Sequence, residues 1–173
     1  MNIFSPITHE QQQQVIDKTE FYIQLAASLF QRRIKTIPVY FDLTGRASGM
    51  YIAEHRRHYI RYNPYIFAKY FEDNLQNTVP HEVAHYVSDL IYGLERIKPH
   101  GNEWKMIMQS FQVTPSVTSD YDLTGIPVRR LQRFEYKCTC MTHQLSAIRH
   151  NKIIRGKVAY LCRHCSSPIV LCE

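Results

Sequence analysis

Cysteine is absent from the first 137 of the 173 residues, and all five cysteines lie beyond that point. No disulfide framework can therefore support the main body of the protein, and clustered cysteines in a reducing compartment more often hold a metal. Long apolar runs are missing too, since the longest, residues 23–30, is too short and too polar to cross a bilayer. Residues 1–14 have neither a basic nor an apolar stretch, so we expect no secretory signal, no membrane partner and a cytoplasmic location.

Most of the chain has no excess of positive charge, and the excess that exists is concentrated at its end. Residues 1–127 carry a net charge of −1, whereas residues 128–173 hold nine lysine and arginine residues against two acidic ones, a balance of +7. Such asymmetry suggests a polyanion partner, usually nucleic acid and less often an acidic membrane surface. The alternative is a basic face that serves only solubility. With 45% hydrophobic residues, the chain is neither disordered nor collagen-like.

The apolar pattern predicts an α+β protein with two domains, residues 1–127 and residues 128–173. Asn63 and Pro64 are typical of a helix start, Thr78 is expected to cap a later helix, and Gly93 to end it. The expected elements are a helix over 9–33, strands over 37–43, 50–53 and 58–62, helices over 64–72, 79–92 and 100–111, and a connecting loop over 113–127.

The sequence His81-Glu82-Val83-Ala84-His85 is an H-E-x-x-H motif within a predicted helix. Residues four apart lie on one face of a helix, so His81 and His85 can bind one metal ion. A zinc ion with three protein ligands keeps one position for water and lowers the pKa of that water to about 7. Glu82 lies beside the two histidines, where its carboxylate can remove a proton from the water and pass it to a leaving amine. The motif therefore predicts a catalytic zinc with Glu82 as general base.

The third ligand of this site must come from another part of the chain. Asp89 follows on the same helix face but lies about 12 Å along the axis from His81, which is too far. Glu95, just after Gly93, is one possibility. His100, which opens the next predicted helix, is the other and is favoured, because a returning loop can close the distance and Trp104 stands behind it.

The cysteines predict a second, structural zinc site in the C-terminal domain. Cys162 and Cys165 form a C-x-x-C knuckle, and 21 residues separate Cys162 from the earlier pair, Cys138 and Cys140, which is typical of a zinc ribbon. The first half is irregular, because C-x-C is one residue shorter than a knuckle. Either Cys138 and Cys140 both bind, or His143 replaces one of them.

Several of these motifs together resemble the SprT family of zinc metallopeptidase-like proteins, which is related to the eukaryotic Spartan proteases. The resemblance rests on residues 81–86, on His100-Gly101-Asn102-Glu103-Trp104, and on the segments 45–49 and 60–64. It implies a minimal zincin-like metalloprotease core, a small sheet packed on helices, followed by the zinc ribbon. It also implies that His100 is the third ligand of the catalytic zinc.

Basic residues between the two cysteine pairs are expected to contact nucleic acid. Residues 149–152 match an Arg-His-Asn stretch of the family, and we expect them on the connecting strands of the ribbon or on their turn. The residues assigned to this contact are Arg149, His150, Lys152, Arg155 and Lys157.

The leading hypothesis is therefore a zinc endopeptidase that the basic ribbon brings to DNA. Resemblance to Spartan proteases implies that its substrate is protein bound or crosslinked to DNA, and hence a role in DNA–protein crosslink repair. A second hypothesis is a nucleic-acid-binding or regulatory protein whose zincin core is catalytically silent. A third is a small-peptide hydrolase without a nucleic-acid partner.

Overall fold

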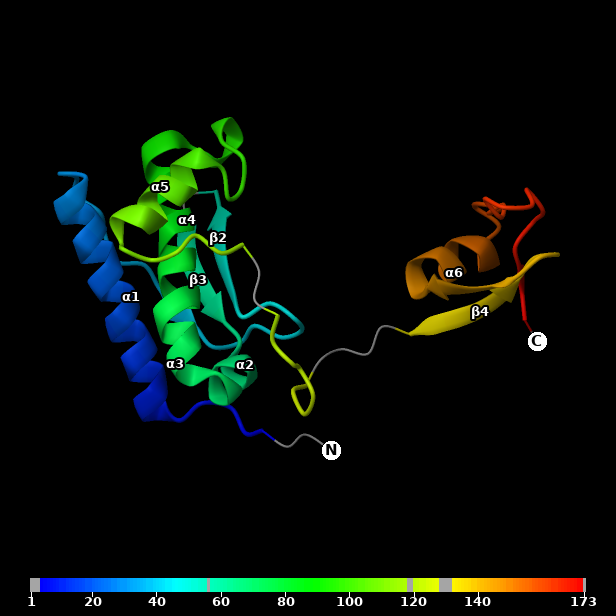
Figure 1. Cartoon of the computed structure of the whole chain (residues 1–173), viewed down its shortest axis with the longest axis horizontal. Coiled ribbons are helices and arrows are strands. Elements are labelled where there is room, and N and C mark those ends of the chain that lie inside the picture. Colours follow the sequence, from blue (N-terminus) through cyan, green and yellow to red (C-terminus); the bar gives the residue numbers. More distant parts are fainter. Residues whose placement is uncertain (1–3, 56, 118–119, 128–131, 173) are drawn as a thin grey trace. The chain divides into compact units, whose positions relative to one another are not determined.

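The structure is a computed structural model that describes residues 4–55, 57–117, 120–127 and 132–172. It divides into two compact units, Met1–Val128 and Arg129–Glu173, each with its own small sheet, packed with several helices in the first unit and with one described helix in the second (Figure 1). The mixed α+β character expected from the sequence is confirmed. Among the described helices, none has both the length and the apolar character needed to cross a bilayer.

The sheet of the N-terminal unit has three short strands, β1 (Val39–Tyr40), β2 (Gly49–Glu54) and β3 (Arg57–Tyr62), in the order β1-β3-β2. Strand β2 pairs antiparallel with β3 and forms one edge of the sheet, with Tyr51 opposite Ile60. The strand expected over 37–43 is much shorter. Pro38 has no N–H for a ladder, and after Tyr40 the chain bends so that the Leu43 amide bonds to Tyr62 instead.

Helix α1 (His9–Leu29) starts at a capping box, in which the Thr8 side chain accepts from the Gln11 amide and the Gln11 side chain accepts from the Thr8 amide. The helix ends four residues earlier than expected. Its buried face is made of residues three and four positions apart, which are Val15, Thr19, Tyr22, Ile23 and Ala26. This face packs against α4 (Val79–Tyr92), which lies between α1 and the sheet (Figure 1).

Asn63 caps α2 (Pro64–Lys69), as expected, by accepting from the amides of Tyr65 and Ile66. The prediction that Thr78 caps a separate helix is wrong. Thr78 has helical backbone angles, and α3 (Phe71–Asp73) continues through a π-helical turn, η1 (Asn74–Thr78), directly into α4. Pro80 explains the wide turn, because a proline inside an α-helix lacks the amide hydrogen and its ring clashes with the carbonyl four residues back.

The core of the N-terminal unit gathers around α4. After Gly93, a 3₁₀ turn, η2 (Leu94–Arg96), leads to α5 (Asn102–Ser110), which packs against α4 as well. Trp104 of α5 is only 1% exposed and is among the largest fully buried side chains. Helix α4 is therefore fixed on three sides, by α1, α5 and β2, and this fixes the direction of its polar residues.

The C-terminal unit contains β4 (Arg133–Lys137), β5 (Thr142–Ser146) and β6 (Val170–Leu171) in the antiparallel order β5-β4-β6, together with α6 (Ala147–Ile154). The prediction that residues 149–152 lie on strands or their turn is wrong, because they form the middle of α6. The backbone of Ser146 adopts the extended N-cap conformation, which starts the helix directly after β5. Within the described residues of this unit, the buried apolar side chains are only Tyr136, Leu145 and Cys162.

Candidate functional site

Three histidines from one helix and a turn converge at one point. His81 and His85 lie one turn apart on α4, and His100 lies in the turn before α5. Their Nε2 atoms form a nearly equilateral triangle, with distances of 3.2 Å between His81 and His85 and 3.0 Å from His100 to each of the others. The structure therefore brings together all three histidines that the sequence analysis assigned to one ion.

The chemistry of this triangle fits a zinc ion. Burial lowers the pKa of His81 to about 4 and that of His85 to about 3, and it also lowers the pKa of His100, so the three rings are neutral at neutral pH. Nitrogen atoms at the corners of a tetrahedral zinc site are about 3.3 Å apart, given Zn–N bonds of about 2.0–2.1 Å. The observed separations are close to this value.

Two hydrogen-bonding contacts hold His81, one at its ring and one at its backbone. Its Nδ1 atom lies 3.2 Å from the carbonyl oxygen of Ser116. Because a carbonyl only accepts, Nδ1 carries the proton and Nε2 keeps the lone pair that a metal needs. The indole N–H of Trp104 donates to the backbone carbonyl of His81 at 3.2 Å. The ring of Trp104 also lies 4.7–5.7 Å from all three imidazole rings, centroid to centroid.

His100 reaches the triangle because of an unusual backbone conformation. Its φ is +57°, in the left-handed region that residues other than glycine rarely adopt. The Gly101 amide closes the turn by donating to the carbonyl oxygen of Lys98 at 2.9 Å. Such strain, of order 1–3 kcal/mol, concentrates at functional sites. Glu95, the alternative ligand, lies on η2 and is not part of the cluster.

Glu82 is buried beside the histidines, with only 6% of its surface exposed. Burial raises the pKa of Glu82 to about 8, and the backbone N–H of Tyr51, which donates to Oε2 at 2.7 Å, opposes this rise. Gly49 leaves the space that the Glu82 side chain fills. The carboxyl group is therefore held between α4 and the edge strand β2.

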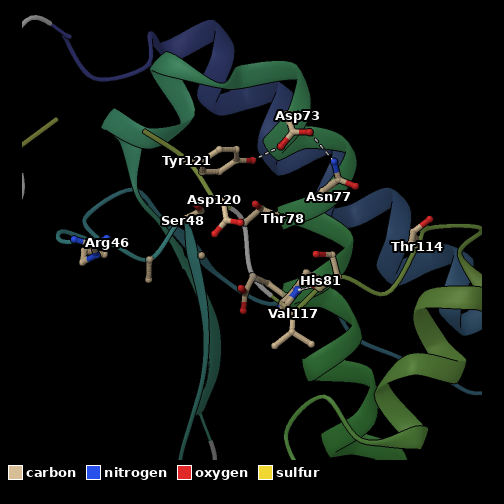
Figure 2. Close-up of a pocket in the computed structure, with 14 residues that line it drawn as sticks. Arg46, Ser48, Asp73, Asn77, Thr78, His81, Thr114, Val117, Asp120 and Tyr121 are labelled. Atoms are coloured by element: carbon tan, nitrogen blue, oxygen red, sulfur yellow. Dashed lines mark hydrogen bonds between the residues drawn. The ribbon is translucent and has the colours of Figure 1, made fainter. Parts of the chain in front are cut away.

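An open cleft of about 600 Å³ runs past His81 and Glu82. One wall is the segment Arg46–Gly49, and Asp73, Asn77 and Thr78 line the cleft from the helical side (Figure 2). The facing wall is the first part of a segment that we call the strap, residues 114–117 and 120–126, which lines the cleft from Thr114 to Tyr121. Figure 2 shows Val117 of the strap beside His81 and Tyr121 pointing at Asp73, with which its hydroxyl forms a hydrogen bond. The Tyr121 ring also stacks on Tyr70 at 4.3 Å.

The far end of the strap is fastened to α2 by charge. Lys69 Nζ donates to the Asp122 carboxylate at 2.9 Å and to the carbonyl oxygens of Asp122 and Thr124. The strap therefore contacts a metal-site histidine at one end, through Ser116, and helix α2 at the other.

The four cysteines assigned to the second site also meet, with all four sulfur atoms within 4.8 Å of one another. The Sγ atoms of Cys138 and Cys140 are 3.4 Å apart, and those of Cys140 and Cys162 are 3.7 Å apart. The sulfur atoms of a tetrahedral Cys₄ zinc site are about 3.8 Å apart, given Zn–S bonds of about 2.3 Å. Hydrogen bonds from the Thr139 hydroxyl, and then from Ser167, lower the pKa of Cys165 to about 5, which favours the thiolate.

His143 is adjacent to this cluster rather than a member of it. Its Nε2 atom lies 3.2 Å from Cys138 Sγ, within hydrogen-bonding distance. The arrangement favours the four cysteines as ligands, with His143 supporting one of the sulfur atoms. Cys172 is not part of the cluster, and its amide bonds to Glu135 O beside β6.

The five residues assigned to nucleic acid differ in exposure. Arg149, Lys152, Arg155 and Lys157 are exposed on α6 and directly after it. His150 instead stacks on Phe134, with ring centroids 3.6 Å apart and an interplanar angle of 4°, and its Nδ1 atom lies 2.9 Å from the hydroxyl oxygen of Tyr136.

Three residues that shape the first site were missed by sequence reasoning. Tyr51 and Ser116 act through backbone atoms, and Gly49 acts by having no side chain, so residue types carry no signal of these roles. The only indication is that Gly49 ends one of the segments resembling the SprT family.

Comparison with known proteins identifies the family. The model of the SprT-like family matches residues 18–130, which contain the whole histidine cluster and stop before the first cysteine. The chain belongs to the SprT-like family. It is similar to Protein SprT of Vibrio parahaemolyticus, with 36% identity over 85% of this chain and 86% of that protein. It is also similar to Protein SprT of Pasteurella multocida, with 35% identity over 91% and 92%.

A third SprT-like relative extends the comparison. Protein SprT of Shewanella oneidensis is 34% identical over 92% of this chain and 99% of its own length. No solved structure matches this SprT-like chain. The resemblance inferred from the motifs is thus confirmed at the level of the family.

Proposed function

We propose that this SprT-like protein is a zinc-dependent endopeptidase whose N-terminal unit is a minimal zincin core. The observation that carries the proposal is the convergence of three neutral imidazole nitrogens next to a buried carboxyl group at the wall of an open cleft. His81, His85 and His100 would hold the zinc ion, and the cleft would receive the polypeptide substrate.

The proposed chemistry assigns one task to each group. When bound, zinc with three imidazole ligands supplies a water molecule of lowered pKa and polarises a carbonyl oxygen. Glu82 accepts a proton from the attacking water and returns it to the leaving amine. Its burial favours this task, because a raised pKa makes the carboxylate a better base and its conjugate acid still able to donate near neutral pH.

The remaining contacts keep this arrangement in place. The Ser116 carbonyl holds the tautomer of His81, and the Tyr51 amide holds the Glu82 carboxylate against β2. A group that is held before the reaction loses less entropy on reaching the transition state. The cleft is open, which suits a protein chain better than an enclosed small-molecule site would.

In the C-terminal unit, we propose a zinc ribbon in which Cys138, Cys140, Cys162 and Cys165 hold a structural zinc ion. A closed set of four thiolates leaves no position for water, so this metal would stabilise the fold and take no part in catalysis. The small buried core of the unit makes such a metal necessary.

We propose DNA as the partner of this ribbon. Arg149, Lys152, Arg155 and Lys157 are exposed and close together in sequence, so α6 can present them to a phosphate backbone. His150 is packed on Phe134, so we assign it to supporting α6 instead of contacting phosphate. The resemblance to Spartan proteases extends the proposal to the substrate, protein bound or crosslinked to DNA, and the cytoplasm is the proposed location.

The test of the enzymatic proposal is Glu82→Gln, because glutamine keeps the shape but cannot act as a base. The expected result is loss of DNA-stimulated cleavage of a protein crosslinked to DNA, with unchanged zinc content by elemental analysis. Glu20→Gln, on the exposed side of α1, serves as the control and should remain active. Unchanged cleavage by Glu82→Gln would reject this mechanism. A wild-type protein that binds DNA without cleaving protein would favour a catalytically silent core.

The test of the DNA proposal is the dependence of affinity on salt. Each lost phosphate contact should reduce the slope of log affinity against log salt concentration by about 0.7–0.9. Lys152→Gln and Arg155→Gln should each produce such a reduction, whereas Arg32→Gln in the N-terminal unit should not. Absence of DNA binding would instead favour a peptide hydrolase without a nucleic-acid partner.

A further inference from the structure

Tyr51 contacts helix α4 at two points, and only one of them belongs to the site described above. Its backbone N–H donates to Glu82 Oε2 at 2.7 Å. Its phenol hydroxyl donates to Asp89 Oδ2 at 2.6 Å. Glu82 and Asp89 are seven residues apart, which is close to two full turns, so both lie on the helix face towards β2. One residue thus joins an edge strand to two points, two turns apart, on the helix that carries the metal ligands.

The phenol is also held from the side of the sheet. His58 Nδ1 on β3 lies 2.5 Å from the Tyr51 hydroxyl oxygen, and the two rings are stacked with an interplanar angle of 7°. Because the phenol proton goes to Asp89, the His58 nitrogen is the donor in this contact. Burial, and then the hydrogen bond to Asp89, raise the pKa of Tyr51, so the hydroxyl keeps its proton.

Asp89 is itself fixed. Its other oxygen, Oδ1, accepts from the Leu94 amide at 3.2 Å, and its side chain is only 15% exposed. The carboxylate therefore cannot follow the phenol if the strand moves, and it acts as a fixed point at the end of α4. This gives Asp89, which is too far along the helix to bind the metal, a definite task.

The position of the Tyr51 amide depends on these contacts because β2 is an edge strand. Only β3 pairs with it, and its other edge has no neighbouring strand among the described residues. The Tyr51 N–H points out of this edge towards Glu82. A displacement of β2 relative to α4 would move the amide away from the carboxylate that it orients.

We propose that Tyr51 is a positioning residue for Glu82, and that its hydrogen bond to Asp89 fixes edge strand β2 on helix α4. This inference rests on the proposed function, since it assigns the Tyr51–Asp89 pair to the orientation of the general base. The hydroxyl of Tyr51 contacts His58 and Asp89 and none of the proposed metal ligands. It acts on the reaction through its own backbone.

The experiment compares Tyr51→Phe and Asp89→Leu with wild type in the full-length, zinc-loaded protein. Each variant should lower kcat roughly tenfold, since small displacements of a reacting group cost this much or more. KM should change less than twofold and zinc content should not change. Asp89→Leu also removes the acceptor of the Leu94 amide, so the double variant should be no worse than Asp89→Leu alone, because Tyr51→Phe then removes nothing further. Asp89→Asn keeps one acceptor oxygen, which can serve the phenol while the bond to the Leu94 amide is lost, so it should retain clearly more activity than Asp89→Leu.

Tyr59→Phe is the matched control, because it removes a phenol hydroxyl from the neighbouring strand that, among the described residues, hydrogen-bonds to Glu54 at 3.4 Å and not to α4. Its kcat should equal that of wild type. The inference is overturned if Tyr51→Phe has wild-type kcat, or if Asp89→Asn is as damaging as Asp89→Leu. It is also overturned if the losses follow melting temperature and disappear on cooling, which would indicate a purely structural role.

Failure of the proposed function can be told apart from failure of this inference, because in the first case the wild-type protein itself would show no hydrolysis that depends on Glu82. In that case the ¹³C carboxyl resonance of Glu82 and the hydrogen exchange of the amide at position 51 decide the positioning claim. Both should change in Tyr51→Phe. If neither changes, Tyr51 does not position Glu82.

Discussion

Gly49 lies directly against the side chain of Glu82. A Cβ atom at position 49 would stand 2.7 Å from Glu82 Cγ, 2.8 Å from Oε1 and 2.9 Å from the methyl group of Thr78. Real Cβ atoms do not approach other atoms so closely, so any other residue at this position must displace the carboxyl group. The proposed general base on α4 thus owes its location partly to the absence of a side chain at the start of the facing strand β2.

Gly49→Ala should therefore reduce activity more than stability. Glu82 can move away from the new methyl group at a cost of about 1–3 kcal/mol in unfolding free energy, the usual cost of overpacking. The displaced carboxylate should lower kcat roughly 10- to 100-fold. Denaturant unfolding and steady-state kinetics measure the two effects. Met50→Ala, at an exposed position on the same strand, is the control.

Trp104 should report binding of metal at the histidine site. It is the only tryptophan in the chain, and its ring is in contact distance of all three imidazoles. Adding zinc to the chelated protein should change the fluorescence emission, and Cu²⁺ should quench it strongly. His85→Ala should abolish both responses, whereas Cys162→Ser should keep them. An emission spectrum insensitive to metal would contradict the assignment of this site.

Loss of the cysteine-bound metal should unfold only the C-terminal unit. Cys162→Ser should bind one zinc ion per chain instead of two, and α6 should become sensitive to trypsin at its exposed lysine and arginine residues. Helices α1 to α5 have a cysteine-free core of their own and should keep their amide signals. Cys172→Ser, outside the cluster, should retain two zinc ions. Simultaneous unfolding of both units would show that they are not independent.

The anchor of the strap should weaken in acid. Hydrogen bonds from the Thr124 hydroxyl and from Lys69 hold the pKa of Asp122 below its ordinary value. The pKa of Asp122 is thus lower in the folded state than in the unfolded state, where it is about 3.9. The stabilisation that its contacts give to the fold is therefore complete above about pH 4 and is lost as the pH falls further. Its energy is small, because the side chain of Asp122 is 66% exposed.

The Thr124 amide resonance, whose N–H bonds to the Asp122 carboxylate, follows this titration directly. Its midpoint should lie below that of an ordinary aspartate in wild type and move upward in Lys69→Met. Asp122→Asn should show no such titration. A midpoint unaffected by removal of Lys69 would mean that the ion pair does not form.

Local spacing predicts the parts of the site that lie within one helix. His81 and His85 share a face because a helix repeats every 3.6 residues, and this holds in any packing environment. His100 is also predictable, because fifteen residues after His85 suffice for the chain to return. The Asn63 cap and the start of α2 are local in the same sense.

Contacts between distant segments are not predictable in this way. Tyr51 and Ser116 are 31 and 35 residues from the groups that they orient, and each uses a backbone atom that every residue possesses. The helical state of residues 149–152 was missed because a cysteine framework indicates strands and turns, whereas α6 depends on how the chain leaves β5.

The π-helical turn before the histidines has a geometric consequence. The Val79 amide bonds to Asn74 O, five residues back, so this turn contains one residue more than an α-turn. Every later residue of α4 is therefore rotated about the helix axis relative to its place in an unbroken α-helix extending from α3. The rotation is that of one residue, about 100°. This single extra residue sets the direction in which His81, Glu82 and His85 project from the helix axis. Pro80, immediately before the first histidine, prevents the turn from tightening into a regular α-helical turn.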